Sequence, residues 1–185
     1  MASAPVLAAP VLAPPPASVP LEEVKAYLRI VGSEEDALLA GFVRSAGAAC
    51  EDFTRLALIE RAVEERVAAR AGWVRLAQTP VRAILGMSLL GGDGAATALA
   101  AGAFSVDIDA AGDGWVRMTS GGSGGPYVVA YRAGLGADWN GVPEALRLGI
   151  VRLAAHFFQH RGAEGAAPPA AVTALWLPYR RLRLS

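Results

Sequence analysis

Two histidines, His156 and His160, are the side chains whose type and spacing could support chemistry. They lie four residues apart in "HFFQH", so a helix would place both imidazoles on one face, where they could bind one metal ion. The sequence has no other histidine, and its single cysteine, Cys50, lies in another predicted helix. Phe157 stands where a zinc-protease helix has its glutamate. We therefore predict no metal site here and interpret the stretch as the end of a buried helix.

Two further stretches carry residues that could bind ions or phosphate. "DIDAAGDG" has Asp107, Asp109 and Gly112 at the spacing of a calcium loop, but Ala111 and Met118 occupy ligand positions. The glycines of "SGGSGG" lack the Lys-Ser/Thr of a phosphate-binding loop, and no Gly-x-Ser-x-Gly elbow occurs. We therefore predict no catalytic residue, no metal site and no cofactor, and a protein that is not an enzyme.

Composition indicates a folded protein without a membrane span. With 185 residues, 54% of them hydrophobic and 18% charged, the chain can bury a substantial core. The formal net charge of zero argues against an overall basic field for nucleic acid. The lone cysteine excludes an intrachain disulfide, and Gly, Asp or Arg interrupts every long apolar run. We expect a soluble, intracellular protein.

Hydrophobic periodicity predicts an α+β fold with a helical core. Two helices are expected within 21–58 and one long helix over 143–161, and runs rich in branched and aromatic residues between them predict a small antiparallel β insert at about 59–132. The stretch from Ile59 to Ala68 fits either a helix or a strand. Residues 1–20 form an Ala/Pro-rich arm expected to be flexible, 21–162 the main domain, and 163–185 a flexible C-terminal docking segment.

The final long helix is predicted to have two apolar faces, so it should contact partners on both sides. One face consists of Leu146, Ile150, Leu153 and Phe157. The other face, predicted to meet an adjacent element or a neighbouring subunit, consists of Leu148, Val151, Ala155 and Phe158.

The C-terminal segment follows a Gly/Ala/Pro run over 162–170 and combines apolar anchors with arginines, a composition typical of interfaces. An alternative is that Trp176 fills the core of its own subunit. The predicted docking residues are Leu175, Trp176, Leu177, Tyr179, Arg180, Arg181 and Arg183.

Several blocks in a fixed order resemble the head-to-tail connector (adaptor) family of long-tailed phages, which has similar proteins in prophages and gene transfer agents. The blocks are "VKAYLRI", "EEDALLAGFVRSAGAACEDFTRLALI", "AQTPVRAI", "YRAGLGADWNGVPEALRLGIVRLAAHFFQHR" and "AVTALWLPYR". The resemblance runs from about Leu21 to Arg180.

This resemblance implies a structural protein with no enzymatic activity. Members of the family form a ring, expected to have 12 subunits, that docks beneath the portal protein and continues the channel for double-stranded DNA toward the stopper or tail. For this chain it implies assembly in the bacterial cytoplasm, a final place in the particle neck and no membrane contact. Given a portal as partner, the composition of the C-terminal segment makes this segment the expected portal-docking element. It also favours a strand from Ile59 to Ala68.

Two alternatives remain open at the level of sequence. The chain could be a small metal-binding protein that uses His156 and His160, or a nucleic-acid-binding module that uses Arg180, Arg181 and Arg183. Metal analysis tests the first alternative, and a steep salt dependence of duplex binding would favour the second.

Overall fold

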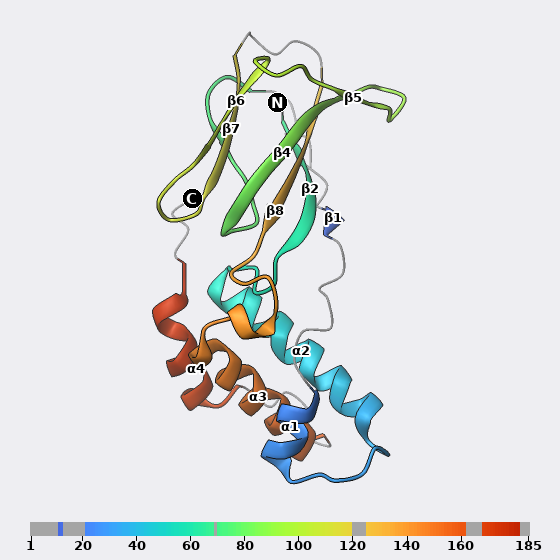
Figure 1. Cartoon of the computed structure of the whole chain (residues 1–185), viewed down its shortest axis with the longest axis vertical. Helices are drawn as coiled ribbons and strands as arrows, with labels where there is room; N and C mark the ends of the chain where they lie inside the picture. The colour runs from blue at the N-terminus through green and yellow to red at the C-terminus, as the bar shows by residue number, and fades with distance from the viewer. Residues whose placement is uncertain (1–10, 13–20, 69, 120–124, 162–167, 182–185) are drawn as a thin grey trace, which may run out of the picture. The chain divides into compact units, whose positions relative to one another are not determined.

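A computed structural model of the chain describes residues 11–12, 21–68, 70–119, 125–161 and 168–181 (Figure 1). Helices and antiparallel sheets are both present, which confirms the predicted mixed class. The chain divides into two compact units. The β unit comprises 60–134 together with residues up to 15, and the helical unit comprises 16–59 and 135–185.

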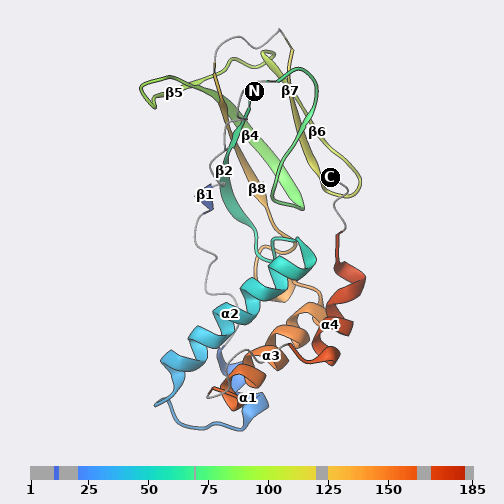
Figure 2. The ribbon, with the colours of Figure 1, turned by 180° about the vertical axis from the view of Figure 1, so that it is seen from behind.

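The helical unit is organised around α3, which is covered by α1, α2 and α4 (Figure 2). A 3-10 turn, η1, precedes α3, and a second one, η2, follows α4. The bounds are α1 Leu21–Leu28, α2 Asp36–Thr54, η1 Trp139–Gly141, α3 Glu144–Gln159, α4 Ala170–Trp176 and η2 Leu177–Tyr179.

Both helices predicted within 21–58 are present, and the second one ends earlier than expected. Arg55 adopts the left-handed conformation, with φ of 62°, and donates its backbone N–H to the Glu51 carbonyl. The Glu51 side chain then accepts the Leu58 N–H at 2.8 Å, so residues after Thr54 turn away from the helix axis. Apolar periodicity continues through this stop, and no glycine marks it. The boundary was therefore not visible in the sequence.

An ion pair joins the first two helices. The Lys25 ammonium lies 2.9 Å from a carboxylate oxygen of Asp36, and only 9% of the lysine side chain is exposed. Hydrogen bonding to Asp36 raises the pKa of Lys25 above its usual value. Lys25 therefore stays charged at neutral pH and ties the start of α2 to α1.

The core of the helical unit is built on both faces of α3. Leu146, Ile150 and Leu153 are fully buried on one side, and Val151 and Ala155 are buried on the other. Val24 of α1, together with residues of α2 and α4, completes the cluster. The remaining buried members from these elements are Leu39, Val43, Ala46, Cys50, Val172 and Trp176.

The β unit contains two antiparallel sheets. The five-stranded sheet has the order β1-β2-β8-β4-β5, and the three-stranded sheet has the order β3-β7-β6. The strands are β1 Val11–Leu12, β2 Arg61–Val67, β3 Val74–Arg75, β4 Val81–Leu90, β5 Ala96–Ala98, β6 Phe104–Ile108, β7 Gly114–Met118 and β8 Tyr127–Ala133.

The stretch from Ile59 to Ala68, whose sequence fits either a helix or a strand, contains strand β2. Its residues alternate between buried and exposed from Arg61 to Val67, which is the pattern of a half-buried strand. Strands β3, β4, β6, β7 and β8 also fall in runs that the sequence predicted. In the N-terminal arm, Val11–Leu12 pairs with β2 opposite Val63 and Glu64, and the rest of the arm lies outside the described residues.

Replacing Val151 by Asp should destabilise the helical unit, because Val151 is only 6% exposed and a carboxylate there would lack a partner. We expect the free energy of unfolding to fall by at least about 3 kcal/mol, measured by chemical denaturation. Val31→Asp is the matched control, because Val31 is 97% exposed and should tolerate the charge. An unchanged stability for Val151→Asp would show that this face is open to water.

Candidate functional site at the C-terminal segment

The two histidines lie at the end of α3, as the sequence predicts. Their ring centroids are 4.2 Å apart, and the Nδ1 atom of His160 lies 2.9 Å from the His156 carbonyl oxygen, within hydrogen-bond distance. Among the described residues, no group of three or more His, Cys, Asp or Glu side chains could hold a metal ion. The Cys50 thiol is fully buried, and burial raises its pKa above the usual value. Burial therefore keeps the thiol protonated, and the described residues offer the two histidines no third His, Cys, Asp or Glu ligand.

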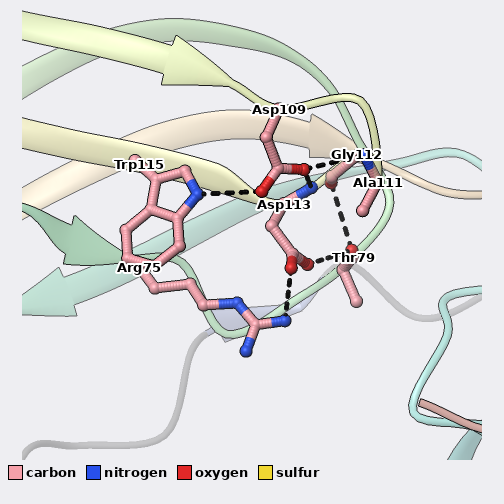
Figure 3. Close-up of polar contacts among 7 residues, drawn as sticks. All are labelled: Arg75, Thr79, Asp109, Ala111, Gly112, Asp113 and Trp115. Carbon is pink, nitrogen blue, oxygen red and sulfur yellow. Dashed lines mark hydrogen bonds and ion pairs between the residues drawn. The ribbon is translucent and has the colours of Figure 1, made fainter. Parts of the chain in front are cut away.

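Two aspartates of "DIDAAGDG", Asp109 and Asp113, make hydrogen bonds and an ion pair inside the β unit (Figure 3). Asp109 accepts the Ala111 and Asp113 backbone N–H groups at 2.9 Å each, which closes the turn between β6 and β7. Asp113 forms an ion pair with Arg75 at 2.6 Å and accepts the Thr79 hydroxyl at 3.0 Å. Both carboxylates serve internal contacts, which supports the interpretation of the stretch as a strand end and turn.

Trp176, predicted as a docking anchor, lies in the core of its own subunit. Its side chain is 1% exposed, and its indole N–H donates to the Leu146 carbonyl of α3 at 3.4 Å. Its ring lies 5.9 Å from the Phe53 ring, between centroids. Gly149 forms the notch in α3 that receives the indole, because a Cβ atom there would collide with Nε1 of Trp176. The structure thus has the alternative arrangement, in which Trp176 fastens α4 to α3.

The rest of the segment presents a smaller exposed surface. Leu177 is 60% exposed, and the exposed Arg180 places its guanidinium 5.3 Å from the Phe53 ring centroid. The backbone N–H of Arg181 donates to the Thr54 carbonyl at 3.0 Å, which holds the chain at the end of α2. Leu175 and Tyr179 are partly buried against the helical core. Arg183 lies outside the described residues.

The second face of α3 also packs inside the helical unit. Val151 and Ala155 are buried, and the Phe158 ring makes an edge contact with Phe42 of α2 at 6.5 Å between centroids. Leu148 is half-buried. The adjacent element that this face meets is therefore part of the same chain, and a role of Leu148 and Phe158 in contact with another subunit stays a prediction.

We predict that purified protein holds no stoichiometric metal at His156 and His160, because the pair lacks a third ligand in the described structure. Elemental analysis should give the same zinc content for the wild type and for the His156→Gln/His160→Gln variant. One bound metal per chain that disappears in this variant would overturn the prediction.

Gly149→Ala should loosen the C-terminal segment, because the added methyl group occupies the position of the Trp176 indole. Helix propensity alone would favour Ala over Gly by about 1 kcal/mol, so destabilisation would identify the notch as the cause. Chemical denaturation and proteolysis of the segment measure the effect.

The control is the same substitution in a Trp176→Ala background. There the methyl group meets no indole, so Gly149→Ala should be neutral or stabilising. If Gly149→Ala behaves identically in both backgrounds, the notch does not hold Trp176.

Comparison with known proteins finds similar chains among solved structures. No family model and no curated protein matches the sequence. Among solved structures, a chain in the neck of an empty gene transfer agent (GTA) particle, solved with C6 symmetry, is similar with a TM-score of 0.79 and 27% identity, over 96% of this chain and 98% of that chain.

Two further solved structures with similar chains are also GTA particles. A chain in the virion of a native GTA particle is similar with a TM-score of 0.77 and 28% identity, over 94% of each chain. A chain in the neck of a native GTA particle, solved with C12 symmetry, gives a TM-score of 0.74 and 28% identity over 97% of each chain. These likenesses confirm the resemblance of this chain to the head-to-tail connector (adaptor) family.

Proposed function

We propose that this chain is a structural head-to-tail adaptor in the neck of a phage-like particle. The observation that carries the proposal is similarity along nearly the entire chain, 96% of it, to a chain in a GTA neck at a TM-score of 0.79. Asp109 and Asp113 make contacts inside the β unit, and Cys50 is buried in the helical core. The protein then acts by binding other proteins, with no catalysis and no cofactor.

The adaptor is a ring in this proposal. Similar chains occur in necks solved with C6 and C12 symmetry, which supports a ring of identical subunits, and we propose 12 copies. The ring joins the portal protein to the stopper or tail, and packaged double-stranded DNA passes through its lumen without sequence-specific contacts. Assembly takes place in the cytoplasm of the producing cell. No helix among the described residues is long and apolar enough to cross a membrane.

In this proposal the helical unit is the core of the connector domain, 21–162, and the β unit is its insertion. The C-terminal segment docks on the portal through its exposed residues, which are not buried against α3. Leu177 supplies the apolar contact and Arg180 the charge, while Trp176 holds the segment in place from inside the subunit. This division of roles narrows the docking residues predicted from the sequence to those that a partner can reach.

Binding to purified portal protein tests the proposal. The Leu177→Asp/Arg180→Glu variant should bind portal at least about tenfold more weakly, since an apolar anchor and a cation are both reversed. Its free energy of unfolding should stay within about 1 kcal/mol of the wild type, because both side chains are exposed and the variant loses the contact of Arg180 with the Phe53 ring. Native mass spectrometry of the complex measures both affinity and the number of copies.

Val31→Asp is the control, since it places a charge at an exposed site elsewhere in the same unit. If the double variant binds portal as the wild type does, the segment is not the docking element. If the wild type binds no portal and forms no ring, the proposed function is wrong.

A further inference from the structure

Among the described residues, the three-stranded sheet of the β unit has two edges without a paired strand. In the order β3-β7-β6, the central strand β7 has both neighbours, while β3 and β6 each pair on one side only among the described residues. An open edge presents free backbone N–H and C=O groups, and proteins usually cover such an edge or protect it with charges. The side chains along these two edges differ in polarity and charge.

The β6 edge is apolar with one negative charge. Val106 is 47% exposed and Ile108 is 39% exposed, although Val106 is paired with Val116, which is fully buried in the core of the β unit. The apolar face of the sheet therefore continues beyond its core at β6. Asp107 lies between the two apolar residues, is exposed, and has no ion-pair partner among the described residues.

The β3 edge carries an exposed aromatic side chain and positive charge. Trp73, immediately before β3, is 41% exposed, and the Arg117 guanidinium lies 4.8 Å from its ring centroid. Arg70 and Arg117 line one pocket of the β unit together with Val74. Both arginines are exposed and have no carboxylate partner among the described residues. Exposed Trp and Arg beside a pocket are typical of the centres of protein interfaces.

The two edges complement each other in both charge and polarity. One has two exposed aliphatic side chains around an unpaired carboxylate, and the other has an exposed tryptophan beside two unpaired guanidinium groups. Arg117 itself belongs to the central strand β7, and its guanidinium lies over Trp73 on the β3 side. Strand β7 separates β6 from β3 in every subunit, so the backbone edge of β6 cannot pair with β3 of the same chain.

We propose that the β6 edge of one copy binds the Trp73 edge of the next copy, and that this contact closes the ring. The proposal rests on the proposed function, which supplies the second copy as the partner. Because the two surfaces differ, the contact is head-to-tail, and a repeated head-to-tail contact closes into a ring when the rotation allows it. A contact between two identical edges would stop at a dimer.

Crosslinking between two singly substituted chains tests the contact. Ser105→Cys places a thiol on β6, and Ala71→Cys places one beside Trp73, so the proposed contact residues remain intact. The native Cys50 is fully buried and should not react. The two variants are mixed, assembled on purified portal, and treated with a short bis-maleimide.

We expect covalent dimers that contain one chain of each variant, and no larger species, because each chain has one reactive site. Neither variant alone should crosslink. Thr97→Cys, on the exposed edge strand β5 of the other sheet, replaces Ser105→Cys in the control and should give no dimer.

The outcomes separate this inference from the proposed function. Rings that form without mixed dimers, or that give dimers of Ser105→Cys alone, contradict the contact and leave the adaptor role standing. A wild-type chain that forms no ring on portal contradicts the adaptor role, and with it the contact.

Discussion

The helical unit depends on one requirement, which is that α3 must be covered on two sides. A helix with buried residues on both faces is stable in water only when neighbouring elements shield it from solvent. Here α1 and α2 supply part of the cover, and the C-terminal helix α4 supplies another part through Trp176. The ion pair of Lys25 with Asp36 and the hydrogen bond of Trp139 with Glu23 at 3.0 Å then fix the surrounding helices. The C-terminal segment is thus part of the core before it can be part of an interface.

Because the C-terminal segment belongs to the core of its own subunit, only part of it is open to a partner. Gly149 lets the indole approach the α3 backbone, and the Leu146 carbonyl accepts its N–H. Once Trp176 is seated, Leu177 and Arg180 lie at the surface beside the end of α2. An anchored segment loses less conformational entropy when it binds than a free peptide would. In the proposed adaptor, the portal-docking residues are therefore held ready by the fold.

Much of the secondary structure could be predicted because hydrophobic spacing reports burial directly. The two-faced pattern of α3 and the strand-like runs within 59–132 are examples, and the structure has elements at these places. The end of α2 could not be predicted, because Arg55 adopts its left-handed conformation without a glycine signal. The burial of Trp176 could not be predicted either, since composition gives the same expectation for a core anchor and an interface anchor. Gly149 was the missed signal, because a glycine inside an apolar helix often receives a bulky neighbour.

If the chain joins filled heads to tails, particles produced without it should lack tails. Electron microscopy of particles from cells that lack the gene should show heads containing DNA but no attached tails. A copy of the gene supplied in trans should restore tailed particles. Normal tailed particles in the absence of the chain would contradict the account.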